Sequence, residues 1–165
     1  GAPVAKAVVD RWPFADASFD AAVSADVLCH ESAHPDRALA EAARCLRPGG
    51  VLVLNLPAYE WLRSYHDERV RTARRFTRRG VRRLLGAAGL DRVFDTYWNT
   101  LPFPLMVVQR RLIGAPPLMS DVHEYPRWQE ALFGGLMSLE GAWLRRRLPL
   151  PFGGSVLAVA RRRHG

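Results

Sequence analysis

The sequence has little lysine and little cysteine, and both shortages restrict what the protein can be. Lys6 is the only lysine among 24 basic residues, so the net charge of +8 comes from arginine. The two cysteines, Cys29 and Cys45, have neither the spacing of a zinc site nor the number that a disulfide framework needs. Free thiols suit a reducing compartment. We therefore predict a cytoplasmic protein without a metal, in which Cys45 packs on a helix face.

Long apolar runs are also missing. No uninterrupted apolar stretch approaches the roughly 20 residues that cross a bilayer. Residues 1–10 lack the basic start and apolar block of a secretory signal. The 165 residues are most simply one domain, long enough to bury a real core.

Arginine is concentrated in two places. Nine of the arginines lie between Arg63 and Arg83, and three more follow one another from Arg161 to Arg163. Such clusters can bind a polyanion. The alternative is a GC-rich coding bias that fills solvated positions with arginine, and the high alanine content favours it. No DNA- or RNA-binding motif accompanies the charge, so we predict no specific nucleic-acid partner.

Short apolar runs alternate with helical patterns along the chain. Proline and Asp36 suit the first turn of a helix, and Thr77 can cap another that Gly89 ends. The predicted strands are Val4–Val9, Phe19–Ser24, Val51–Leu56, Leu90–Trp98 and Ser155–Ala160, with Phe19–Ser24 buried on both faces. The predicted helices are Pro35–Leu46, the helix after Thr77, Pro102–Ile113 and Pro126–Arg147, the last two separated by the breaker-rich stretch Gly114–Ser120.

This alternation predicts an α/β domain with a mostly parallel sheet. In such sheets the ligand crevice lies beyond the carboxyl ends of the strands. The rule selects three segments of this sequence as candidate crevice walls: Val8–Trp12, Ser24–Glu31 and Pro57–Asp67.

Two segments resemble a known family when they are taken together. They are WPFADASFDAAVSADVLCH, from Trp12, and DRALAEAARCLRPGGVLVLNLPAYEWL, from Asp36. In this order and spacing they resemble the class I S-adenosylmethionine-dependent methyltransferases that act on small molecules. The later segments SYHDERVRTARRFT and LPFGGSVLAVARR resemble one bacterial branch of that family.

The resemblance implies a Rossmann-like methyltransferase sheet that is incomplete at its amino-terminal side. It implies one partial domain over residues 1–165, a helical insertion or cover at 100–150, and Ser155–Ala160 as an antiparallel strand. The cofactor would be S-adenosylmethionine. The family's glycine-rich turn after its first strand, and the acidic residue that ends its second strand, are not found here. The chain is thus expected to be the carboxyl-terminal part of an enzyme or a degenerate relative, with an exposed sheet edge that favours homo-oligomers.

The resemblance assigns four residues to the cofactor. Val8 and Val9 match positions that contact the adenine, although valine offers only an apolar contact there. Ala25 and Asp26 match positions near the methionine part, where Asp26 can meet the ammonium group. The alternative for Val8 and Val9 is that they are core residues of a strand. The alternative for Asp26 is that its side chain caps a turn.

Two histidines are candidate catalytic residues. His30 lies at the mouth of the predicted crevice and could remove a proton from a substrate hydroxyl or amine. His66 is the second candidate, with Asp67 paired to a nearby arginine. Methyl transfer from a sulfonium often needs only positioning, so a packing role is favoured for His30.

Four residues are candidates for substrate binding. Tyr59 and Trp61 could form an aromatic wall, or a lid packed on a neighbouring helix. Arg75 could bind a carboxylate or phosphate by a forked contact, or be a solvated helix-start arginine. Tyr97 could add a second wall at the end of its strand.

The sequence therefore predicts methyl transfer to a small, partly apolar metabolite. The alternative is a non-catalytic remnant that binds a protein partner or itself. A third hypothesis is a basic module that binds anionic membranes or nucleic acid, and only the arginine clusters support it. The predicted helices Pro102–Ile113 and Trp128–Leu148 are apolar and end in arginines, which suits a helix that lies on a membrane or meets a hydrophobic substrate. A peripheral membrane or hydrophobic-substrate contact is expected on the same grounds.

Overall fold

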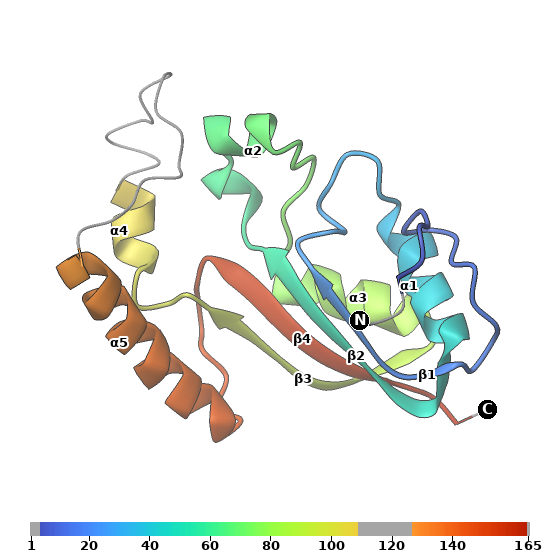
Figure 1. Cartoon of the computed structure of the whole chain (residues 1–165). Helices are drawn as coiled ribbons and strands as arrows, with labels where there is room; N and C mark the ends of the chain where they lie inside the picture. The colour runs from blue at the N-terminus through green and yellow to red at the C-terminus, as the bar shows by residue number, and fades with distance from the viewer. Residues whose placement is uncertain (1–3, 109–126, 165) are drawn as a thin grey trace.

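The core of the protein is a four-stranded sheet (Figure 1). The computed structural model describes residues 4–108 and 127–164. The strands are β1 (Phe19–Ala25), β2 (Leu46–Pro57), β3 (Leu90–Trp98) and β4 (Ser155–Arg162), in the spatial order β1-β2-β4-β3. Strand β1 is parallel to β2, and β4 is antiparallel to both of its neighbours. Strands β1, β2 and β3 therefore point the same way, and the expected incomplete α/β sheet with an antiparallel last strand is confirmed.

One face of the sheet is covered by two helices, α1 (Pro35–Cys45) and α3 (Arg78–Ala87), as Figure 1 shows. The alternation along β2 directs every second side chain toward these helices. The buried side chains on this face include Leu39, Leu52, Leu54, Leu56, Val81, Leu85, Val156 and Ala158. The buried thiol of Cys45 ends α1, which confirms its predicted place on a helix.

Local signals set the ends of both covering helices. Pro35 occupies the first turn of α1, and Asp36 follows it near the positive end of the helix dipole. The Thr77 hydroxyl accepts a hydrogen bond from the Gly80 N–H and caps α3. Gly89 follows α3 with a φ of 74°, a conformation in which a side chain would be strained.

Two strand predictions need correction. Val4–Val9 forms no strand: Val8 makes an isolated bridge with Arg11, and the Val4 side chain is 94% exposed. A β-branched run becomes a strand only beside a partner strand, and this run has none among the described residues. Strand β1 is formed as predicted but is not buried on both faces, because it lies at the sheet edge with Val23 76% exposed.

The segment between β2 and α3 is irregular. A 3₁₀ turn (Glu60–Leu62) and the short helix α2 (Tyr65–Arg69) stand above the carboxyl end of β2 in Figure 1. The 3₁₀ turn lies inside the predicted crevice wall Pro57–Asp67, and α2 begins inside it and ends two residues beyond it.

Helices α4 (Phe103–Val108) and α5 (Arg127–Arg145) lie at the left of Figure 1, on the side where β3 ends. They confirm the start of the predicted helix Pro102–Ile113 and most of the predicted helix Pro126–Arg147. Positions 109–113 and the breaker-rich stretch Gly114–Ser120 lie outside the described residues. That 100–150 is an insertion within one domain stays a prediction.

Glu140 attaches α5 to the end of β3. Its side chain is 3% exposed, and its carboxylate accepts the Thr100 N–H at 3.0 Å and the Leu101 N–H at 3.5 Å. A buried carboxylate is tolerated where backbone donors satisfy it in this way.

Candidate functional site

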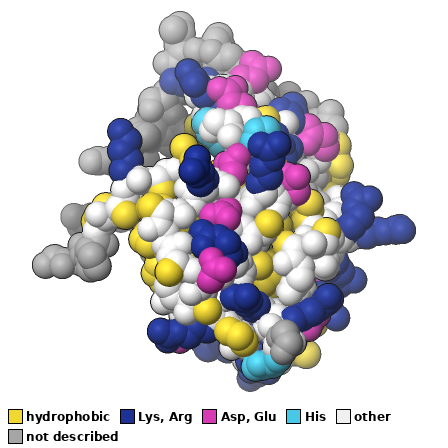
Figure 2. Space-filling view, turned by 90° about the vertical axis from the view of Figure 1, so that its right-hand side faces the viewer, with side chains coloured by type: hydrophobic (Ala, Val, Ile, Leu, Met, Phe, Trp, Pro, Cys, Tyr) yellow, Lys and Arg dark blue, Asp and Glu magenta, His cyan; other side chains and the backbone are white. Residues whose placement is uncertain are grey.

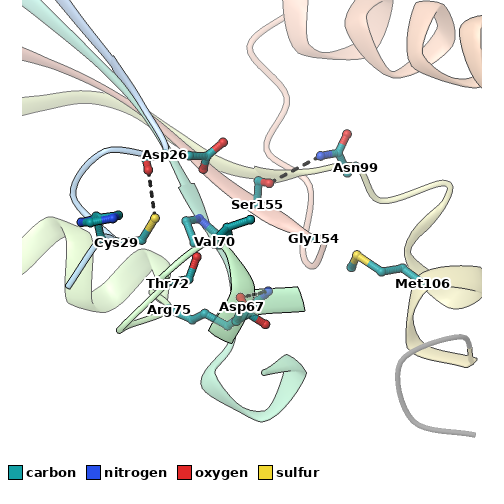
Figure 3. A pocket seen from close by; sticks show the side chains of 12 residues that line it. Asp26, Cys29, Asp67, Val70, Thr72, Arg75, Asn99, Met106, Gly154 and Ser155 are labelled. Atoms are coloured by element: carbon teal, nitrogen blue, oxygen red, sulfur yellow. Dashed lines mark hydrogen bonds and ion pairs between the residues drawn. The ribbon is translucent and has the colours of Figure 1, made fainter. Parts of the chain in front are cut away.

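The carboxyl ends of β1, β2 and β3 and the start of β4 lie at the same end of the sheet. Asp26, Pro57, Asn99 and Ser155 come from these four places and line a common crevice, shown in Figure 3. This is the edge at which the α/β rule predicted a ligand.

The chain turns sharply as it leaves each of these three strands. Asp26, Tyr59 and Asn99 have φ angles of 53°, 56° and 59°, in the left-handed region that side chains rarely adopt. Each such residue costs energy, and strain of this kind concentrates at ligand sites.

Asp26 is held by a short chain of hydrogen bonds. The Trp98 indole N–H donates to the Asn55 Oδ1 at 2.8 Å, and the Asn55 Nδ2 donates to the Asp26 Oδ2 at 3.1 Å. Because an indole N–H can only donate, it fixes which end of the Asn55 amide faces Asp26. The Asp26 N–H also donates to the Asn55 carbonyl at 2.9 Å.

The Asp26 carboxyl is partly shielded from water. Burial raises the pKa of Asp26 above its ordinary value, and the Asn55 hydrogen bond and the positive charge of Arg75 oppose this shift. A partly desolvated carboxylate attracts a cation more strongly than one in bulk water does.

Asp26 and His30 stand between two adjoining cavities. One, of about 540 Å³, is lined by Val8, Val9, Asp10 and Ser32, among others. The other, of about 400 Å³, is lined by Cys29, Thr72, Arg75, Asn99, Met106 and Ser155, among others. Asp26 and His30 line both, so ligands in the two cavities would meet beside them. The structure thus brings the predicted residues Val8, Val9, Asp26 and His30 together.

His30 is half-buried and is fixed by Ser32. Its Nδ1 lies 2.8 Å from the Ser32 Oγ and accepts the Ser32 N–H at 3.3 Å. Because a backbone N–H can only donate, this contact favours the tautomer with the proton on Nε2. In that tautomer the free ring nitrogen is a donor, which suits holding a ligand better than removing its proton.

Arg75 is already paired. Its side chain is 4% exposed, its Nη2 lies 2.6 Å from the Asp67 Oδ1, and its Nη1 donates to the Ala58 carbonyl. The Asp67 Oδ2 in turn accepts the Ser64 N–H at 2.8 Å. This pair fastens α2 to the end of β2 and forms one wall of the crevice (Figure 3). It confirms the predicted pairing of Asp67 with a nearby arginine, and the guanidinium it engages is less available to an anionic ligand.

The predicted aromatic wall lies beside the crevice. Tyr59 stacks on Tyr97 with ring centroids 4.9 Å apart, and Trp61 and Phe103 pack around Tyr59. None of these four rings lines either cavity. Their packing on α4 fits the alternative of an aromatic lid.

Ala25 and His66 are the two remaining residues that the sequence predicted for the cofactor and the catalytic site. Ala25 ends β1, opposite Asn55 in the register, and lines neither cavity. The side chain of His66 lies outside the described part of the structure.

Several residues of the site were not predicted. Asn55 lines neither cavity but donates a hydrogen bond to Asp26, and it could have been found because it is the one polar residue in the apolar run Val51–Leu56. Ser155, Thr72 and Met106 carry no such signal, since only the fold brings them to the carboxyl edge.

Several of the described arginines form ion pairs with carboxylates. Figure 2 shows basic and acidic side chains interspersed over the face that it draws. Arg44 pairs with Asp16 and Glu41, and Arg47 pairs with Asp20. This pattern favours solvated arginines over a polyanion-binding stripe on that face.

Two kinds of feature are absent from residues 4–108 and 127–164. These residues contain no group of three or more His, Cys, Asp or Glu side chains placed to hold a metal ion. None of the described helices is long and apolar enough to cross a membrane.

Comparison with known proteins agrees with this geometry. Residues 2–54 match a family model described as a methyltransferase domain. No curated protein sequence matches the chain.

Solved structures share the fold. The partner of the Trm112 methyltransferase activator in a complex from Haloferax volcanii is 22% identical, with a TM-score of 0.57 over 96% of this chain and 60% of its own. A SAM-dependent methyltransferase from Thermotoga maritima is 20% identical, with a TM-score of 0.57 over 99% of this chain and 65% of its own.

The [4+2]-cyclase SpnF has a TM-score of 0.56 at 19% identity, over 98% of this chain and 56% of its own. The chain thus spans somewhat less than two thirds of the length of these similar structures. Residues 2–54 thus match a model of a methyltransferase domain, and the chain shares the Rossmann-like fold of these solved methyltransferase structures.

Proposed function

We propose that the crevice binds S-adenosylmethionine and a small, partly apolar acceptor, and that the protein transfers the methyl group between them. The observation that carries this proposal is the pair of adjoining cavities with Asp26 and His30 between them. A two-substrate transfer needs two sites whose reacting ends meet.

The difference between the two cavities supports one arrangement of the two ligands. The cavity beside Val8 and Val9 offers apolar surface to the adenosine part, and Asp26 offers a carboxylate to the ammonium group. The acceptor would occupy the cavity lined by Cys29, Asn99, Met106 and Ser155. Its lining mixes sulfur and carbon surface with hydroxyl and amide groups, which supports a partly apolar small molecule.

The protein's own contribution would be positioning. When bound, the cofactor supplies a sulfonium methyl that is already electrophilic, so no protein nucleophile is required. Asp26 and His30 would hold the two ligands in line across the junction of the cavities, which is where alignment lowers the barrier. The His30 Nε2–H would donate a hydrogen bond to the methyl-acceptor molecule and so help to orient it.

Calorimetric titration with S-adenosylhomocysteine, at low and at high salt, tests the cofactor site. We expect micromolar, salt-insensitive binding that Asp26→Asn weakens at least tenfold. The matched control is Asp20→Asn, which removes a carboxylate at the other end of β1 and should leave the affinity unchanged. No binding by the chain, or equal losses in both variants, would overturn the proposal.

The exposed edge strand favours a second candidate function. Strand β1 leaves one side of its backbone without a partner strand among the described residues, and Val23 beside it is 76% exposed. Such an edge can pair with another chain. The protein would then act as a non-catalytic module that binds itself or a partner, and it would bind no S-adenosylhomocysteine.

A further inference from the structure

The outer side of α5 exposes large apolar side chains. Together with two neighbouring leucines they form a patch that we call the α5 surface: Leu101, Leu132, Leu139, Trp143 and Leu148. Each of these side chains is between 42% and 67% exposed. Large exposed apolar patches rimmed by polar groups mark interaction sites on soluble proteins.

The helix itself arranges the patch. Leu132, Leu139 and Trp143 are separated by seven and four residues, a spacing that places them in one stripe along α5. A hollow of about 310 Å³ adjoins the stripe, lined by Leu101, Leu139, Trp143 and Leu150, among others. The stripe is therefore continuous with an apolar depression.

Arginines continue the stripe at its carboxyl end. Arg145, Arg146 and Arg147 are all exposed. The Arg146 N–H donates to the Trp143 carbonyl at 3.0 Å, so Arg146 lies about one turn beyond the indole. Tryptophan followed by arginines is an arrangement typical of helices that lie in a membrane interface.

Carboxylates are few beside this patch. Helix α5 contains Arg127, Glu130, Glu140 and Arg145, and residues 146–165 add five arginines and no acidic residue. Glu140 lines the hollow, but it is only 3% exposed and its carboxylate accepts the Thr100 and Leu101 N–H groups. The side chain of Glu130 lies outside the described part of the structure, and the described side chains of the patch and of the arginines beside it include no exposed carboxylate.

We propose that the α5 surface binds an anionic lipid bilayer. Leu132, Leu139 and Trp143 enter the interface between headgroups and acyl chains, and the three arginines bind lipid phosphates. Charge favours lipid over a second copy: the described side chains of a second α5 surface offer these arginines no exposed carboxylate, whereas anionic lipid offers a dense layer of phosphate. The contact is peripheral and does not depend on methyl transfer.

Co-sedimentation with vesicles tests this proposal. The 165-residue chain is mixed with phosphatidylcholine vesicles and with vesicles of phosphatidylcholine and phosphatidylglycerol at three to one. We expect binding to the mixed vesicles, weakened by salt, and little binding to phosphatidylcholine alone. The double variant Leu139→Ser/Trp143→Ser should bind at least tenfold more weakly, with circular dichroism confirming that it is folded.

Two double variants that remove the same charge test whether binding depends on the arginines beside α5 or only on the net charge of the protein. Arg146→Gln/Arg147→Gln should weaken binding by roughly fivefold for each arginine removed. Arg79→Gln/Arg83→Gln removes the same charge from exposed positions on α3 and should change binding far less. The proposal is overturned if the wild-type chain does not sediment with the mixed vesicles, or if both arginine pairs weaken binding equally. It is also overturned if Leu139→Ser instead abolishes a dimer in solution.

Discussion

Asp26 meets three requirements at a single residue. It turns the chain in a left-handed conformation, it keeps a partly desolvated carboxyl at the junction of two cavities, and it accepts the Asn55 amide. The first two of these cost stability, since a left-handed residue is strained and a shielded carboxylate has lost part of its hydration. Sites that bind ligands commonly retain such costs.

Replacing Asp26 by asparagine should therefore stabilise the protein. Asparagine tolerates left-handed backbone and carries no charge to desolvate, so the free energy of unfolding should rise, by less than about 1 kcal/mol because the side chain is open to solvent. Urea denaturation at pH 7 measures this, with Asp20→Asn as the control that should not stabilise.

The same variant predicts a change in pH dependence. Burial raises the folded-state pKa of Asp26 above its ordinary 3.8, so the folded protein keeps this proton to higher pH than the unfolded chain does. The contribution of Asp26 to stability therefore falls as pH rises from 3.8 through the raised pKa. Asp26→Asn should lack this decline in urea titrations between pH 3.5 and 7. An unchanged decline would contradict the assignment.

At the scale of residues, the sequence predicted the positions of the site residues better than their roles. Val8, Val9, Asp26 and His30 do line one cavity. The rule about strand ends explains the place of Asp26, which directly follows β1, but not that of Val8 and Val9, which belong to no strand. The pairing of Arg75 with Asp67 and the stacking of Tyr59 on Tyr97 depend on packing between segments far apart in the chain. No local pattern encodes those contacts, so substrate roles for these residues stay predictions.

At the scale of elements, locally encoded boundaries were predicted closely. Strand β3 runs from Leu90 to Trp98 as predicted, and Thr77 caps α3, because caps and glycine stops act over a single turn. The predicted strand Val4–Val9 did not form, because a strand needs a neighbouring strand with which to pair. The exposure of β1 was missed for the same reason.

The connection from α5 into β4 passes very close to the end of β3. A Cβ on Gly153 would lie 2.3 Å from the Trp98 carbonyl oxygen, whereas a Cβ on Gly154 would meet the mobile end of Met106 at 2.8 Å. Gly153→Ala should destabilise the protein by about 3 kcal/mol, because backbone cannot move aside cheaply. Gly154→Ala, the matched control, should cost clearly less. Thermal denaturation of both variants checks the order, and equal losses would contradict it.

Asp95 couples helix α3 to strand β3. Its carboxylate is fully buried and accepts from Arg78 at 2.6 Å, Arg82 at 2.9 Å and Arg92 at 2.9 Å. Asp95→Asn would leave three guanidinium groups without their counter-charge, and we expect a loss of about 3 kcal/mol in urea denaturation. Asp91→Asn removes the exposed pair with Arg163 and should change stability by less than about 1 kcal/mol.

The pH dependence of this cluster has the opposite sign to that of Asp26. Burial alone would raise the pKa of Asp95, but hydrogen bonds from Arg82, Arg78 and Arg92 outweigh it and hold the pKa below its ordinary 3.8. The stabilisation is complete above the unfolded-state pKa and is lost as pH falls through the folded one. Asp95→Asn should therefore weaken the acid sensitivity of the fold, while Asp91→Asn should leave it largely intact.

At the scale of the whole molecule, the two edges of the sheet are protected differently. Both edge strands contain a register shift, between Phe19 and Ala21 in β1 and between Arg92 and Phe94 in β3, so the edges differ in charge and not in this irregularity. Strand β3 carries Asp91, Arg92 and Asp95, and charges on an edge strand oppose edge-to-edge pairing. Strand β1 reads Phe-Asp-Ala-Ala-Val-Ser-Ala and has Asp20 as its only charge. We infer that association between copies uses β1.

A lysine on each edge tests this inference. Val23→Lys places a charge on β1 and should lower concentration-dependent association in analytical ultracentrifugation at least fivefold. Val93→Lys makes the same change on β3, where the wild-type residue is also exposed, and should have little effect. If the two variants associate alike, or if wild-type protein stays monomeric at all concentrations, β1 is not the contact.

The position of β4 has a consequence for synthesis on the ribosome. This strand is the last of the sheet to be made, yet it lies between β2 and β3 and is the neighbour that β3 pairs with. A nascent chain that ends before Ser155 can pair β1 with β2, but its β3 has no described strand to join. Completion of the sheet must therefore wait until residues 155–162 have left the exit tunnel. Until then β3 lacks the strand that pairs with it, and such an unpaired strand favours aggregation of a partly made chain.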